Sequence, residues 1–153
     1  QELSNLLWAA NGINRPEKGM RTTPSAMNAQ EVDVYVCMKE GAYFYDAKSN
    51  QLKPVIQEDL RGLVAGKQDF VKSAPVVLLL VSDLSKLPGG NSEHSKLMAA
   101  VDVGIVSQNI SIACSGLGLI TVPRGSMDKD ALAQKLKLKD TQMLLMNSPV
   151  GKE

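Results

Sequence analysis

The chain has 153 residues, 44% of them hydrophobic, which is enough for one domain with a single core. The 17 basic and 16 acidic residues give a net charge of +1, and aromatic residues make up 4%. This balance argues against a broad surface for nucleic acid or an anionic membrane, and it leaves few side chains for stacking on single strands.

The first half of the chain mixes one helix with several strands. A helix is expected over residues 4–14. Alternating valines indicate a strand from residue 31, residues 39–46 turn at Gly41 into a second strand, and residues 46–56 hold a third. A short helix near 58–66 precedes the buried strand 75–82, whose apolar run is too short to cross a bilayer.

The second half is dominated by one long predicted helix, residues 95–119, which ends at a Gly-Leu-Gly stop. Small and apolar residues surround it almost completely, so we expect burial by its own sheet on one side and by a second subunit on the other. Strand 119–122, a helix over 129–138 capped by Asp128 and strand 142–151 follow. Early hairpins and late crossovers predict an α+β fold with a mixed central sheet.

Conventional catalytic and metal sites find little support in the sequence. Cys37 and Cys114 lie in apolar segments typical of buried free thiols, and His94 has no ligand partners at metal-site spacing. Ser25 is not in a nucleophile elbow. The glycines at 116–118 follow a helix, whereas a dinucleotide fingerprint follows a strand.

Three polar segments at the ends of regular elements remain as a candidate ligand site, namely 24–28 (PSAMN), 122–125 (VPRG) and 149–153 (PVGKE). Such ends are where polar groups converge on a ligand held by a rigid scaffold, and a planar ligand with a phosphate would use all three. The structural alternatives are an ordinary Asx or Ser turn at 24–28, a plain strand-and-turn at 122–125, and solvated side chains at Gln68 and Lys152.

The same segments resemble the nitroreductase family of flavoproteins, and the likeness extends over essentially the whole chain. Residues 7–15 and 21–26 are most similar to the short single-domain branch that includes SagB-like dehydrogenases. The other matching segments are the Pro-Ser-x-x-Asn-x-Gln pattern at Pro24, Ser25, Asn28 and Gln30, the helix and strand at 99–125, and the ending 149–151.

This resemblance implies FMN at the interface of a homodimer, with hydride passing from NAD(P)H through flavin N5 to a small organic acceptor such as a nitroaromatic or quinone. A flavin-binding or degenerate module without NAD(P)H turnover is the alternative. The residues implied to contact flavin are Pro24, Ser25, Ala26 and Asn28 from one subunit, the backbone of Arg124 and Gly125 from the other, Gln68 at the pyrimidine edge and Lys152 at the phosphate. Arg124 stands where the family often has Glu, so the resemblance gives its side chain no role.

The chain departs from the family at its start. Family members usually begin with an Arg-rich segment such as Arg-Ser-x-Arg, and nothing similar precedes Leu3. We therefore expect a single domain over 1–153 that lacks an upstream segment, and tighter FMN binding, but unchanged riboflavin binding, when that segment is present. The acceptor and the cellular compartment stay open.

Overall fold

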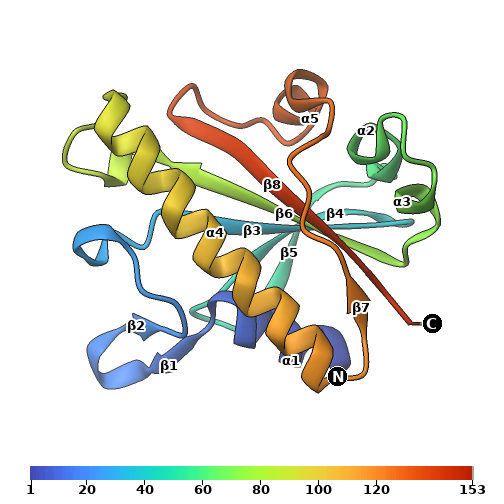
Figure 1. Ribbon diagram of the computed structural model, residues 1–153, viewed down its shortest axis with the longest axis horizontal. Helices are drawn as coiled ribbons and strands as arrows, with labels where there is room; N and C mark the ends of the chain where they lie inside the picture. The colour runs from blue at the N-terminus through green and yellow to red at the C-terminus, as the bar shows by residue number, and fades with distance from the viewer. Residues whose placement is uncertain (153) are drawn as a thin grey trace.

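The computed structural model describes residues 1–152 as a six-stranded sheet with helices on both faces (Figure 1). The strand order is β5-β4-β3-β6-β8-β7, and a separate small hairpin pairs β1 with β2. The strands are β1 (Ile13–Arg15), β2 (Met20–Arg21), β3 (Val32–Met38), β4 (Gly41–Asp46), β5 (Gln51–Ile56), β6 (Val76–Asp83), β7 (Ile120–Thr121) and β8 (Gln142–Gly151).

The four predicted helices occur in the predicted order, with one further short α-helix that the sequence did not predict, and the α+β fold class is confirmed. The α-helices are α1 (Glu2–Asn11), α2 (Arg61–Ala65), α3 (Phe70–Ser73), α4 (Glu93–Gly116) and α5 (Lys129–Lys135), and the short 3-10 helices are η1 (Pro16–Lys18), η2 (Ala26–Asn28) and η3 (Leu84–Lys86). Asp128 caps α5 as predicted, because its Oδ1 accepts the Ala131 backbone N–H at 3.1 Å.

The expectation of a mixed sheet is wrong, since every strand pair among residues 1–152 is antiparallel. The expected crossover does exist, because β6, α4 and β7 form a unit whose two strands run in the same direction. However, β8 lies between β6 and β7 and runs opposite to both. No parallel pair is therefore hydrogen-bonded directly.

Two hydrophobic layers cover the two faces of the sheet. Period-two alternation sends Val34 and Leu80 to the layer under α1 and α4, and Tyr35 and Leu79 to the layer under α2 and α5. Strand β6 is buried on both faces, which explains why it reads as one continuous apolar run. Cys37 and Cys114 belong to these layers as free, buried thiols, as predicted, and burial raises the pKa of Cys37 to about 12.

Helix α4 lies across β3, β6, β8 and β7 of the sheet (Figure 1). It ends as predicted at the glycines, with Gly118 in the left-handed region at φ 67° and the Leu119 N–H bonded to the Cys114 carbonyl at 2.8 Å. Its length and composition would suffice to span a membrane, but in this fold its buried side packs on the sheet. The opposite side leaves Leu97, Val101 and Ile112 at 60%, 48% and 61% exposure, so within one chain burial covers less of the helix than its composition predicts.

Candidate functional site

The loop between β2 and β3 has an unusual backbone. Met27, Asn28 and Gln30 have φ values of 52°, 55° and 52°, which place three non-glycine residues in the left-handed region within four positions. Asn tolerates this region, whereas for Met and Gln it is uncommon and costs about 1 kcal/mol or more each. Met27 also keeps 82% of its surface exposed. The loop is therefore held in a shape that its own residues do not favour.

The polar side chains of the Pro-Ser-x-x-Asn-x-Gln pattern hold this shape. Ser25 Oγ accepts the Gln30 backbone N–H at 2.8 Å, closing the loop across its base. The Gln30 amide nitrogen donates to the Gly19 carbonyl at 2.9 Å and to Asn28 Oδ1 at 3.2 Å, while its oxygen accepts from Arg21 Nε at 3.2 Å. The side chains of Ser25 and Gln30 thus stabilise the loop itself, as expected if these residues form an ordinary turn. Met27 points outward.

The loop is attached to the middle of α4. The Ala26 backbone N–H donates to Asp102 Oδ2 at 2.7 Å, across 76 residues of sequence. Ala26 and Ala29 also pack against a small apolar cluster that contains Leu84 and Ala99. Any movement of α4 at Asp102 would consequently be transmitted to Ala26.

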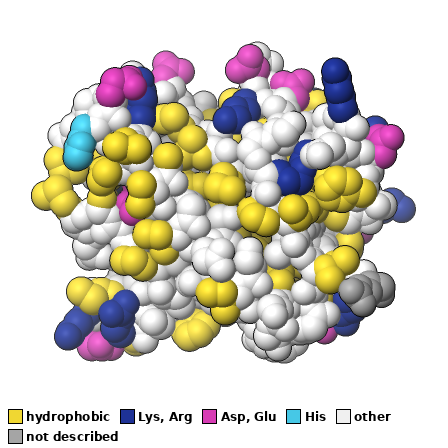
Figure 2. Space-filling model, in the orientation of Figure 1, with side chains coloured by type: hydrophobic (Ala, Val, Ile, Leu, Met, Phe, Trp, Pro, Cys, Tyr) yellow, Lys and Arg dark blue, Asp and Glu magenta, His cyan; other side chains and the backbone are white. Residues whose placement is uncertain are grey.

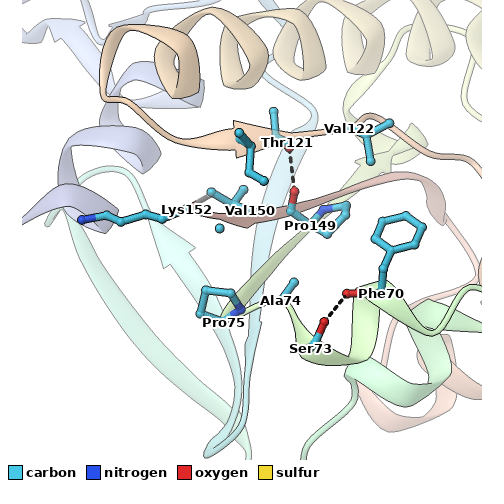
Figure 3. A pocket seen from close by; sticks show the side chains of 11 residues that line it. Phe70, Ser73, Ala74, Pro75, Thr121, Val122, Pro149, Val150 and Lys152 are labelled. Carbon is cyan, nitrogen blue, oxygen red and sulfur yellow. Dashed lines mark hydrogen bonds between the residues drawn. The ribbon is translucent and has the colours of Figure 1, made fainter.

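A largely apolar cavity of about 440 Å³ lies on the other side of the molecule, where the ends of β7 and β8 meet α3 (Figure 3). Phe70 and Val122 face each other at one end, and Lys152 lies at the other end. Thr121 Oγ1 donates to the Pro149 carbonyl at 2.8 Å and ties two walls together. This size is within the range of small-molecule sites.

Lys152 is the charged residue among the described residues that line this cavity. Its Nζ lies 2.9 Å from Glu2 Oε1, and the two side chains are 63% and 56% exposed. An ion pair so open to water contributes little to stability, so an anion could take the place of Glu2 at small cost.

The Arg124 side chain points into the protein instead of toward a cavity. Its guanidinium donates to Gln68 Oε1 at 2.7 Å, to Asn147 Oδ1 at 2.6 Å, and to two backbone carbonyls of α2 at 3.3 Å. Its backbone N–H and C=O pair with Asn147, and burial lowers the pKa of the guanidinium. Arg124 therefore fixes the segment before Gly125 to α2 and β8, and Gln68 is engaged in this network.

One chain does not bring the three predicted segments together. Residues 24–28 lie beside the middle of α4, whereas 122–125 and 149–152 lie past its C-terminal end, next to β7 and β8 (Figure 1). A ligand that touches all three would need a second copy of the chain, as the resemblance implies.

The comparisons with known proteins agree on one family. The model of the nitroreductase family matches residues 1–152. The chain belongs to the nitroreductase family. A candidate nitroreductase of Methanocaldococcus jannaschii is 30% identical over 100% of this chain and 80% of its own length. The FMN reductase (NAD(P)H) of Bacillus subtilis is 29% identical over 72% of this chain and 43% of its own length.

A solved nitroreductase-like structure gives the same fold. The crystal structure of a candidate nitroreductase from Ralstonia eutropha superposes with a TM-score of 0.90 at 32% identity, covering 99% of this chain and 71% of the other. The six-stranded sheet with its crossing helix is thus the nitroreductase fold.

Sequence reasoning missed two buried polar residues that hold the candidate segments in place. Asp102 and Asn147 are 5% and 0% exposed, and each anchors a candidate segment. A signal for Asp102 was available, because it is the single charged residue between Lys96 and Arg124. Asn147 carries no comparable signal, since only the strand pairing shows that it faces Arg124.

Replacing Arg124 with Met should lower the free energy of unfolding by about 2–4 kcal/mol, because buried acceptors on Asn147 and α2 lose their donor. Urea denaturation of the flavin-free protein measures this. Lys152→Met is the matched control, and we expect a change below about 0.5 kcal/mol because its ion pair is exposed. Equal effects of the two substitutions would contradict a structural role for Arg124.

Proposed function

We propose that this chain is an FMN-dependent oxidoreductase that takes reducing equivalents from NAD(P)H and passes them to a small organic acceptor such as a nitroaromatic or quinone. The observation that carries the proposal is the loop at 24–30, held rigidly in a left-handed conformation and presenting Met27 outward beside α4. Strain of this kind is typical of sites that grip a ligand. The family and the name of the B. subtilis relative support FMN as the cofactor.

The residues present fit a flat aromatic cofactor with a phosphate. The cavity at β7 and β8 offers apolar walls to a ring system, and Lys152 offers a cation at its end. Bound flavin would supply hydride chemistry at N5, which explains why the chain needs no acid–base pair of its own. The chain would position the ring through Pro24, Ala26 and Asn28 of one subunit and through the Arg124–Gly125 backbone of the other. Ser25 would act by holding the loop in shape.

To bind the phosphate of FMN, Lys152 would have to exchange Glu2 for the phosphate as its ionic partner. FMN carries a dianionic phosphate, which must be matched by cations or N–H groups when it leaves water. Lys152 can serve once it releases Glu2, and Gln68 can turn its remaining amide group toward the pyrimidine edge while its oxygen holds Arg124. With these two residues, the site could contact the phosphate and the pyrimidine edge of FMN as well as its ring.

A homodimer through α4 completes the site in this proposal. Between Lys96 and the end of α4 the one charged residue is Asp102, and it is buried, so the exposed side of the helix carries no charge over this length. Figure 2 shows hydrophobic side chains on this face of the molecule. The exposed or half-exposed residues of this stripe are Leu97, Ala100, Val101, Gly104, Gln108, Ile112 and Ser115. An uncharged, apolar helix face of this kind fits a second copy of itself across a two-fold axis.

The proposed reaction can be followed by colour. Protein loaded with FMN should be yellow, and NADH or NADPH added without oxygen should bleach it because the flavin becomes reduced. Addition of a quinone should then restore the absorption of the oxidised flavin. A yellow protein that neither nucleotide bleaches would indicate a binding module without turnover.

Asn28→Ala should weaken FMN binding by about 1–3 kcal/mol, because a directional hydrogen bond to the flavin is lost. Fluorescence titration measures this. Since Asn28 is left-handed, Ala also strains the backbone, so Asn28→Gly separates the two causes: equal losses assign the effect to the side chain. Asn50→Ala, at φ 51° in the β4–β5 turn, is the matched control and should leave FMN affinity unchanged.

Val101→Asp should dissociate the dimer, because it places a charge on the uncharged face of α4. Sedimentation velocity measures the change from dimer to monomer, and FMN affinity should fall with it. Gln134→Asp on α5, at the opposite face of the sheet, should change neither. A parent protein that sediments as a monomer with FMN bound would refute the shared site.

A further inference from the structure

Glu31 is a carboxyl group buried beside the flavin-contacting loop. It follows Gln30 directly, its residue exposure is 0%, and neither of its side-chain oxygens receives a hydrogen bond from residues 1–152. A buried carboxylate without donors is strongly unfavourable. Glu31 therefore needs either a cation or a proton.

The cation whose charge acts on Glu31 is Lys86 on η3, but its position favours other partners. Lys86 Nζ lies 3.5 Å from Asp33 Oδ1 and 3.5 Å from the Gln30 carbonyl, and it acts on Glu31 only through its charge. A proton is left as the means of neutralising Glu31.

Asp102 of α4 provides the acceptor for that proton. Its Oδ2 already accepts the Ala26 N–H at 2.7 Å. The pKa of Glu31 is raised to about 7, mainly by burial and also by a hydrogen bond to Asp102 and the charge of Asp102, while its own backbone N–H and Lys86 oppose the rise. The two carboxyl groups thus hold one proton between them.

We propose that Glu31 and Asp102 are positioning residues that hold the flavin-contacting loop through a shared proton. The chain of contacts runs from Glu31 at the start of β3, through Asp102 on α4, to the Ala26 N–H in the loop. Both ends of the loop are fixed in this way, since Glu31 adjoins the left-handed Gln30 and Ala26 precedes the left-handed Met27. The proposal rests on flavin binding at this loop.

Loss of the proton to solvent leaves two buried negative charges side by side. Their repulsion pushes Glu31 and Asp102 apart and loosens the loop. Buried oxygens on Thr22 and Ser82, which also have no hydrogen-bond partner among the described residues, lie next to the loop and opposite Val32 and provide no cation to compensate. FMN affinity is thereby linked to pH near neutrality.

The test compares the parent with Glu31→Gln, whose amide is a permanent neutral donor to Asp102. FMN titrations from about pH 6 to about pH 8.5 should show a parent affinity that falls roughly tenfold relative to the variant, equivalent to a difference of about one pKa unit at Glu31 between free and loaded protein. The ratio of the two cancels the titration of the FMN phosphate itself. Parallel pH profiles for both proteins would overturn the proposal.

A second variant shifts the midpoint. Asp102→Asn can still accept the Ala26 N–H, but it removes the charge that keeps the proton on Glu31, so the fall in affinity should move to lower pH. An unchanged midpoint in this variant would also overturn the shared proton.

Hydrogen exchange of the Ala26 amide tests the same contact without flavin. Its protection factor should fall above about pH 7 in the parent and stay constant in Glu31→Gln. If FMN binds neither protein but this difference persists, flavin binding is refuted and the acid pair is retained as the support of the loop. If protection is the same in both proteins at every pH, the acid pair is refuted.

The free energy of unfolding of the parent should also depend on the protonation of Glu31. The folded state keeps the Glu31 proton up to about 7, whereas the unfolded chain releases it above the ordinary pKa of 4.5. Between these values the folded state binds more protons, so the free energy of unfolding falls as pH rises. Urea denaturation should show this fall in the parent and a smaller one in Glu31→Gln, and identical slopes would count against a proton on Glu31.

Discussion

The packing of α4 across β6 is the constraint on which the other features depend. Residues on one side of the helix, such as Val103 and Ile110, fill the layer above the sheet, and this fixes which side turns outward. The same packing sets the position of Asp102, and therefore of the loop that Asp102 holds. One buried helix thus determines the core, the outward apolar stripe and the anchor of the candidate site.

The candidate site is supported by polar groups whose hydrogen bonds go to other parts of the protein. The loop is bonded by the side chains of Ser25, Gln30 and Asp102. The side chain of Arg124 bonds to α2 and β8. Groups fixed in this way pre-organise a surface, so that a ligand meets a backbone already in place. The left-handed residues of the loop persist because these contacts over-determine its shape.

Two buried ionisable groups, Arg124 and Glu31, are accommodated by different means. Arg124 keeps its positive charge by donating to several neutral oxygens, and the nitroreductase fold supplies these from α2 and β8. Glu31 has no such donors among residues 1–152 and is instead driven toward the neutral form. The first arrangement is insensitive to pH in the neutral range, whereas the second is not.

The sequence by itself determined the order of elements, the α+β class and the long apolar helix, because hydrophobic periodicity and glycine or Asp caps are local signals. It also indicated the family through segments such as 24–30. The insertion of β8 between β6 and β7, the Asp102–Ala26 contact across 76 residues and the Arg124–Asn147 pair were decided only in the tertiary structure. Strand order and buried polar partners depend on which distant segments meet, and no local pattern records that.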